Sequence, residues 1–141
     1  MKLEGKVALV TGGARGIGQA HAIRLAQLGA NVAVNDINLE SFKEFDEAIE
    51  ANSIVELIEG HGVKAMGIEA NVCNEKDAKG VVEQVVSEFG RIDILINNAG
   101  GIAGLPKDSF ASTVSFEDIK ATSEQRNMNT IPIRGATNYL I

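Results

Sequence analysis

The chain is poor in cysteine and histidine and has no long apolar run. Cys73 is the one cysteine among 141 residues, so no internal disulfide can form, which fits a reducing cytoplasm. No run of 18 apolar residues occurs, which excludes a transmembrane helix. His21 and His61 lie far apart, and no Cys/His spacing typical of zinc is present, so we expect no metal site.

Basic residues are also in the minority. Lys and Arg total 13 against 19 Asp and Glu, and the resulting formal net charge of −6 argues against nucleic acid or an anionic membrane as the main partner. The N-terminus contains Glu4 and leads into only a short apolar run, so no signal peptide is expected. With 45% apolar and 23% charged residues, the composition is typical of one soluble globular domain.

Glycine, by contrast, is concentrated in one informative stretch, residues 7–18. The stretch opens with Val-Ala-Leu-Val, typical of a strand buried on both faces, and passes glycines at 12, 13, 16 and 18 into a helix expected over 17–28. The free N–H groups at such a helix start, together with the helix dipole, form an anion site. A tight strand-to-helix turn also selects glycine, so a purely structural role is the alternative.

The rest of the chain alternates between strand and helix patterns, which predicts an α/β fold with a parallel sheet covered by helices on both faces. The third strand contains Lys64 and Glu69 and is expected near a sheet edge. Residues 37–62 fit either one amphipathic helix or two, the second opened by a Ser53/Glu56 capping box. The expected strands are 6–11, 31–36, 63–70 and 92–97, and the other expected helices are 75–89, capped by Asn74 and closed by Gly90, and about 115–126.

Four segments that each follow an expected strand converge on one edge of the sheet: residues 12–18, Asp36, Asn71 with Val72, and residues 97–100. Ligands of open parallel sheets bind at this carboxyl edge. Asp36 lies 18 residues after Gly18, where an acid accepts hydrogen bonds from ribose hydroxyls and repels a 2′-phosphate, so NAD is favoured over NADP. Arg15 has the opposite, modest effect, because a cation in the loop attracts the 2′-phosphate of NADP. A strand-end turn or cap residue is the alternative role for Asp36.

Two of these segments resemble the short-chain dehydrogenase/reductase family. That family has T-G-x-x-x-G-x-G after its first strand and N-N-A-G after its fourth. Here these motifs read Thr-Gly-Gly-Ala-Arg-Gly-Ile-Gly at 11–18 and Asn-Asn-Ala-Gly at 97–100, with the family's usual separation. The resemblance covers residues 1 to about 104. It implies a Rossmann-type doubly wound parallel sheet in three α/β/α layers and hydride transfer between NAD(P) and a small alcohol or carbonyl substrate.

The resemblance also implies a role for each cofactor-binding position. The family usually has Asp-Val against the adenine, so Asn71 is a departure, although its amide can still hydrogen-bond the base. Thr11 is expected to tie the 97–100 segment to the glycine turn. By resemblance, Gly12, Gly16, Ile17 and Gly18 contact the pyrophosphate side, Asp36 the adenosine ribose, Asn71 and Val72 the adenine, and Asn98, Ala99 and Gly100 the nicotinamide ribose.

The family's catalytic groups are a Tyr, a Lys four residues later, a Ser and a helix Asn. Tyr139 comes too early for that Tyr, and Lys120 is the last lysine, so the Ser, Tyr and Lys are absent. Asn127 is the best match for the helix Asn. Asn129 competes with it, and a surface amide is the alternative.

We therefore expect residues 1–141 to form one NAD(P)-binding domain, with a clear family match to about 104 and a divergent, truncated tail over 105–141. The leading hypothesis is the N-terminal half of a short-chain dehydrogenase, inactive as an isolated chain. A non-catalytic NAD-binding module and a structural remnant without ligand are the alternatives. Homo-oligomers are typical of the family, but its usual interface helices and its substrate loop lie beyond residue 141.

Overall fold

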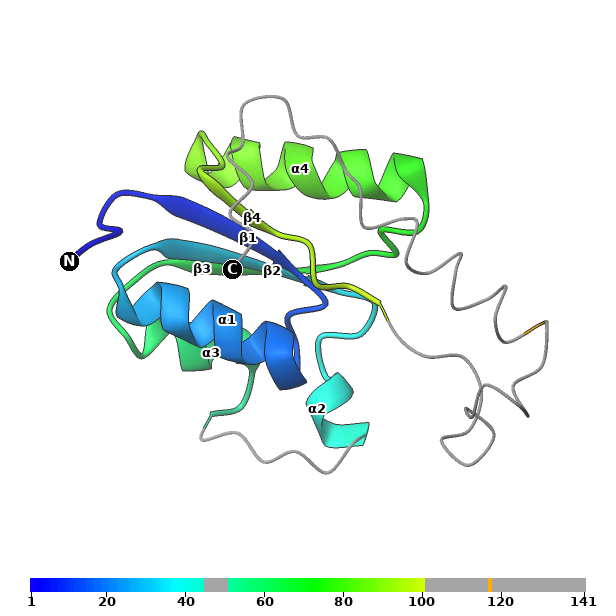
Figure 1. Ribbon diagram of the computed structural model, residues 1–141, viewed down its shortest axis with the longest axis horizontal. Coiled ribbons are helices and arrows are strands. Elements are labelled where there is room, and N and C mark those ends of the chain that lie inside the picture. Colours follow the sequence, from blue (N-terminus) through cyan, green and yellow to red (C-terminus); the bar gives the residue numbers. More distant parts are fainter. Residues whose placement is uncertain (45–50, 101–116, 118–141) are drawn as a thin grey trace.

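The computed structural model describes residues 1–44, 51–100 and 117. Within them, strands and helices alternate around one four-stranded sheet (Figure 1). The strands are β1 (Val7–Thr11), β2 (Asn31–Asp36), β3 (Ala65–Glu69) and β4 (Ile94–Ile96), and the helices are α1 (Gly16–Gln27), α2 (Ser41–Glu44), α3 (Ile54–Glu59) and α4 (Glu75–Phe89).

All four strands are parallel, in the order β3-β2-β1-β4. Helix α4 covers one face of the sheet, and α1 and α3 cover the other (Figure 1). The chain therefore winds in one direction from β1 to β3 and crosses back through α4 to β4, which is the doubly wound, three-layer arrangement that the sequence predicts. Among the described strands, β3 is an outer one, as the charges of Lys64 and Glu69 indicate.

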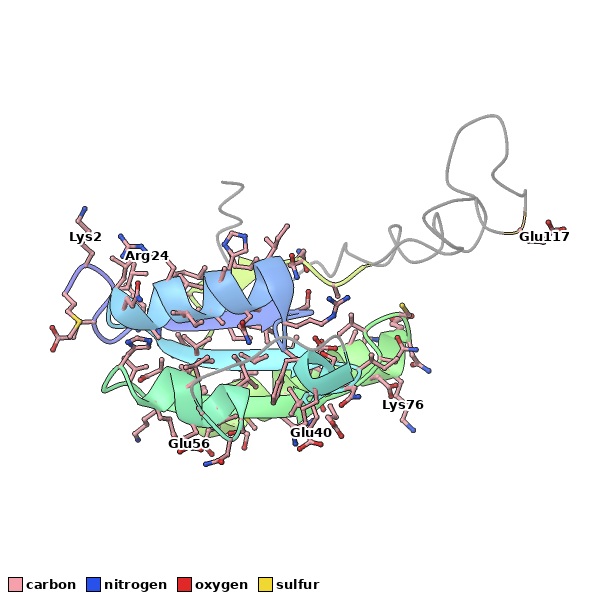
Figure 2. The ribbon with its side chains drawn as sticks, turned by 90° about the horizontal axis from the view of Figure 1, so that it is seen from below. Lys2, Arg24, Glu40, Glu56, Lys76 and Glu117 are labelled. Atoms are coloured by element: carbon pink, nitrogen blue, oxygen red, sulfur yellow. The ribbon has the colours of Figure 1, made fainter. Side chains whose placement is uncertain are left out.

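The core consists of two apolar layers, one on each face of the sheet. Strand β1 is buried along its whole length, because helices cover both of its faces and strands flank it on both sides. The layer between the sheet and α4 includes Leu9, Val81 and Val85. The layer between the sheet and helices α1 and α3 includes Val10 and Ile58. Figure 2 shows that charged side chains such as Lys2, Arg24, Glu40 and Lys76 project away from these layers.

The caps and terminators of the helices follow the sequence closely. The side chain of Asn74 accepts hydrogen bonds from the N–H groups of Lys76 and Asp77, and therefore caps α4. Gly90 ends α4 in the left-handed conformation with φ +79°, and Gly29 follows α1 with φ +97°. The predicted strands differ from the observed ones only at their ends, where β3 and β4 are shorter.

In the described part of the segment 37–62, two separate helices are present, α2 and α3. Residues 51–53 are not helical, and Ser53 has an extended backbone and accepts the N–H of Glu56, so α3 starts anew. The reciprocal half of the predicted capping box is shifted by one residue, because the Glu56 carboxylate accepts the N–H of Asn52 at 3.1 Å. Residues 45–50, Asn127, Asn129 and, apart from Glu117, the predicted helix over about 115–126 lie outside the described residues.

The amino end of the sheet is held by Asp93, whose side chain is 14% exposed. Its carboxylate accepts the backbone N–H of Val7 at 2.9 Å and also pairs with Arg91 and, at 3.6 Å, with Lys6. Burial acts to raise the pKa of Asp93, but the hydrogen bonds from Val7 and Arg91 and the two positive charges outweigh it, so the pKa lies below its ordinary value. This carboxylate joins β1 to the chain entering β4 and lies at the end of the sheet opposite the predicted ligand edge.

Among the described residues, no helix is long and apolar enough to cross a membrane. Over the same residues, no group of three or more His, Cys, Asp and Glu side chains is arranged to hold a metal ion.

Candidate functional site

The segments that follow the four strands meet at the carboxyl edge of the sheet. The turn after β1 contacts both neighbouring strand ends. The N–H of Ala14 donates to the Asp36 carboxylate at 3.1 Å, and the side-chain amide of Asn98 donates to the carbonyl of Gly12 at 3.0 Å. On the far side of β2, the N–H of Ala70 donates to the carbonyl of Asp36 at 3.0 Å. The structure therefore brings together all the described segments that the sequence assigns to this edge.

Thr11 is the central residue of the contact between β1 and β4. Thr11 is 1% exposed. Its hydroxyl accepts the N–H groups of Asn98 and Ala99 at 3.1 and 3.0 Å and donates to the carbonyl of Ile96 at 3.4 Å. The Asn98 amide in turn donates to the carbonyls of Thr11 and Gly12. The loop after β4 is thus fixed to the glycine turn by a hydroxyl and an amide, as expected from the sequence.

The glycines of the turn serve two different physical purposes. A Cβ at Gly18 would lie 2.1 Å from the carbonyl oxygen of Gly12, and a Cβ at Gly12, where φ is +62°, would lie 2.8 Å from the Cα of Ala99. These two positions, and Gly13 against Val34, are therefore glycine because neighbouring atoms fill the space. Gly16 differs, since its φ of +55° favours glycine but, among the described residues, no atom outside the adjacent residues and the helix backbone lies within 4 Å of its Cβ position.

The N-terminus of α1 differs from those of α3 and α4 in its capping. Its N-cap residue, Arg15, makes no side-chain capping hydrogen bond, and the first turn has no acidic residue. In contrast, Ser53 caps α3 and Asn74 caps α4. The N–H groups of a first helical turn have no partner within the helix, and with the positive end of the dipole they favour an anion. Ile17, in the first turn, is 73% exposed beside this end.

Asp36 holds a turn and faces the glycine loop at the same time. One carboxylate oxygen accepts the N–H of Ala14 at 3.1 Å, and the other accepts the N–H of Asn38 at 3.3 Å. The second bond is the strand-end turn that the sequence left open as an alternative. Because each carboxylate oxygen has more than one acceptor position, these bonds leave capacity for further donors such as ribose hydroxyls.

The segment after β3 combines an exposed and a buried residue. Asn71 is exposed, and its side-chain oxygen accepts the N–H of Cys73 at 3.0 Å, which starts the turn into α4. Val72 is 9% exposed and packs in the apolar layer under α4. Contact of Asn71 and Val72 with an adenine, like the ligand roles of the other site residues, stays a prediction.

Sequence reasoning missed Asn35, the residue before Asp36. It is 1% exposed and its side chain donates two hydrogen bonds to the end of β3. The sequence does contain a signal for this role, because Asn35 is a polar residue in a strand expected to be buried on both faces. A polar side chain at such a position needs hydrogen-bond partners within the protein.

Comparison with known proteins agrees with this arrangement. The short chain dehydrogenase family model matches residues 6–131. A cyclohexanol dehydrogenase of Rhodococcus sp. (strain TK6) is 43% identical over 131 residues, which cover 91% of this chain and 48% of that protein. A 3-oxoacyl-[acyl-carrier-protein] reductase of Staphylococcus aureus (strain Mu50 / ATCC 700699) is 45% identical over 95 residues, which cover 67% of this chain and 35% of that protein.

A solved structure shows the same likeness in three dimensions. The short chain dehydrogenase from Mycobacterium paratuberculosis bound to NAD has a TM-score of 0.72 and 29% identity, over 92% of this chain and 48% of that chain. The chain belongs to the short chain dehydrogenase family and corresponds to the N-terminal portion of its members. It spans about half the length of the cyclohexanol dehydrogenase and about a third of the reductase.

Proposed function

We propose that the carboxyl edge of this sheet binds NAD, and that the chain supplies the cofactor-binding portion of an oxidoreductase that transfers hydride between NAD and a small alcohol or carbonyl compound. The observation that carries the proposal is the position of Asp36. Its carboxylate is hydrogen-bonded to the loop that leads into the N-terminus of α1, whose first turn has no acidic residue. An anion site and a ribose acceptor are therefore adjacent, which is the combination that a dinucleotide requires.

The residues present fit the two polar parts of this cofactor. The space at Gly16 and the first-turn N–H groups of α1 suit a pyrophosphate, because among the described residues no atom outside the adjacent residues and the helix backbone lies within 4 Å of the Gly16 Cβ position. Asp36 suits the vicinal hydroxyls of the adenosine ribose. Asn98, Ala99 and Gly100, fixed by Thr11, are assigned to the nicotinamide side, and Asn71 and Val72 to the adenine.

Charge at the edge favours NAD over NADP in this proposal. A 2′-phosphate would lie against the Asp36 carboxylate, and like charges at this range repel. Arg15 is half-buried in the neighbouring loop and is the one feature of the turn that favours the phosphate. We assign the larger effect to Asp36, because the ribose hydroxyl it would bind is the one that carries the phosphate in NADP.

The bound nicotinamide would supply the hydride acceptor or donor, and this part of the chain would bind and orient it. Asn127, which lies outside the described residues, is our proposal for the helix Asn of the catalytic machinery. Because the sequence has no counterpart of the family's Ser, Tyr and Lys, we expect the isolated 141-residue chain to bind NAD without turning over alcohols. A cytoplasmic location, one NAD(P)-binding domain over 1–141 and homo-oligomerisation of the whole enzyme belong to the same proposal.

The substrate is best assigned only as an alcohol or carbonyl compound. The two curated relatives are named for a cyclic alcohol and a carrier-bound oxoacyl group, yet both are more than 40% identical to this chain over the portion compared. A portion shared at this level by enzymes for such different compounds is better suited to holding the cofactor than to selecting the substrate.

Titration calorimetry of the chain with NAD and NADP tests the proposal. We expect NAD to bind more tightly than NADP, and Asp36→Asn to weaken NAD by about ten- to a hundredfold, because hydrogen bonds to a charged acceptor contribute about 1.5–3 kcal/mol. Asp93→Asn makes the same chemical change at the opposite end of the sheet and should leave NAD affinity unchanged. The absence of binding heat for both cofactors in a folded chain would refute the proposal and favour a structural remnant.

A further inference from the structure

The buried amide of Asn35 fastens the end of β3 to β2. Its nitrogen Nδ2 donates to the carbonyl oxygens of Ile68 and Ala70, both at 3.1 Å. Only the nitrogen of the amide can donate to a carbonyl, so these two contacts fix which way the amide group is turned. The side chain is 1% exposed, and its register neighbours are Thr11 on β1 and Ile68 on β3.

The backbone of Asn35 makes the corresponding contact on the other side. Its carbonyl accepts the N–H of Gly13 at 3.1 Å, which holds the glycine turn after β1. One residue thus contacts the glycine turn through its main chain and the end of β3 through its side chain. In the neighbouring strand β1, the side-chain hydroxyl of Thr11 holds the loop after β4 by accepting the N–H groups of Asn98 and Ala99. Two buried polar side chains at one level of the sheet therefore fix the chain segments on either side of the glycine turn.

The choice of Asn at this position has a cost. The amide oxygen Oδ1 is buried and has no hydrogen-bond partner among the described residues. An unpaired buried acceptor is unfavourable, and an apolar β-branched residue, such as Val32 and Val34 in the same strand, would avoid the penalty. The two hydrogen bonds to β3 are the compensating gain, and they act directly before Asn71 and Val72, the segment assigned to the adenine.

We propose that Asn35 is a positioning residue for the adenosine half of the cofactor. By holding the carbonyl of Ala70, it sets the path of residues 71–73 relative to Asp36, whose own carbonyl binds the N–H of Ala70. Asn35 does not touch the ligand and acts through that segment. The inference rests on the proposed NAD site. It adds the residue that fixes the distance between Asp36, assigned to the ribose, and the segment of Asn71 and Val72, assigned to the adenine.

A matched pair of variants tests this role. Asn35→Val keeps a strand-forming side chain and removes both donors, whereas Asn35→Thr has the shape of Val and restores one hydroxyl. Val85→Ala is the control. Val85 belongs to α4 and is fully buried against the sheet, so its truncation destabilises the fold while the Asn35 side chain is kept. Affinities for NAD and ADP are measured by calorimetry and corrected for the folded fraction. Amide hydrogen exchange is followed by mass spectrometry in peptides spanning 70–74 and 12–18.

In Asn35→Val we expect exchange in 70–74 to rise about tenfold or more relative to Val85→Ala, and NAD and ADP to bind about tenfold more weakly. For Asn35→Thr, the exchange rate in 70–74 and the affinities for NAD and ADP should lie between those of Asn35→Val and those of the unmodified chain. ADP should lose as much affinity as NAD, because the altered segment lies on the adenosine side. If Asn35→Val does not fold, Asn35→Thr is held to the same comparison.

The proposal is overturned if exchange in 70–74 and nucleotide affinity both match the Val85→Ala control, which would leave Asn35 a purely structural residue. Faster exchange with unchanged affinity, or weaker affinity with unchanged exchange, would also overturn it. If the unmodified chain binds neither NAD nor ADP, the proposed function fails. The exchange comparison still decides in that case whether Asn35 holds the segment after β3.

Discussion

The glycine at position 18 should be required for folding rather than for ligand contact alone. A methyl group there would lie 2.1 Å from the carbonyl oxygen of Gly12 and 2.5 Å from the amide nitrogen of Asn98, whereas real Cβ atoms essentially never come closer than 3.0 Å. The carbonyl belongs to the backbone and cannot rotate away. In Gly18→Ala, α1 and the glycine turn must therefore separate, and the Asn98 hydrogen bonds to Thr11 and Gly12 are stretched.

The expected loss can be estimated from three contributions. Forcing an extra carbon into a filled site costs about 1–3 kcal/mol. Weakening the two Asn98 hydrogen bonds costs about 1 kcal/mol each. Replacing glycine by alanine in a helix returns about 1 kcal/mol. The balance is a loss of about 3 kcal/mol in the free energy of unfolding, which lowers the urea midpoint by about 1 M or more for a chain of this size.

Urea unfolding followed by circular dichroism at 222 nm measures this change. Gly80→Ala is the matched control, because Gly80 also lies within a helix but, in the described part of the chain, no atom outside the adjacent residues and the helix backbone is within 4 Å of its Cβ position. The control should be stabilised by about 1 kcal/mol, since only the helix propensity changes. An unchanged or raised midpoint for Gly18→Ala would refute the packing argument and return Gly18 to a role in ligand contact alone.

The remaining predictions concern the two ends of the sheet. Thr11→Val should lower the free energy of unfolding by about 2 kcal/mol, because the N–H groups of Asn98 and Ala99 lose their acceptor. Thr11→Ser should retain most of that stability in the same urea assay. The pKa of Asp93 is lowered in the folded state, so its contribution is complete above the ordinary aspartate pKa of about 4 and is lost as the pH falls through the lower folded value. Urea midpoints between pH 7 and 2 should show less acid destabilisation in Asp93→Asn, and an identical pH profile would contradict this assignment.

The order and type of the elements follow from local sequence patterns. The apolar run before Thr11 marks a strand buried on both faces, and the left-handed Gly90 marks the end of α4, because both signals depend on residues close in the chain. Element ends were less well predicted. Residues 63 and 64 continue the apolar-polar pattern of β3, yet the strand begins at Ala65, where pairing with β2 begins. Such limits depend on the partner strand, which local sequence does not specify.

The sequence predicts which segments lie together at the carboxyl edge, but not which neighbouring atoms each glycine of the turn meets. Glycines at 12, 16 and 18 were all expected to admit a pyrophosphate, because each could lie in the turn. The structure separates Gly16, with open space around it, from Gly12 and Gly18, where the loop after β4 and the turn itself fill the space. The contacts with the loop after β4 join residues 80 or more positions apart in the chain, so a single sequence contains no direct record of them.

The contacts at this edge are hydrogen bonds between groups of the protein itself, and this has a consequence for binding. Thr11 holds the loop after β4, Asn35 holds the end of β3, and Asp36 holds the glycine turn, each through hydrogen bonds within the protein. A cofactor that binds a pre-ordered edge loses less affinity to the ordering of loops than one that must assemble it. Variants at Thr11 and Asn35 should therefore weaken binding by loosening the free protein. Their effect on affinity should grow with the exchange rate of the loop each one holds, whereas Asp36→Asn should weaken binding most through the lost ligand contact.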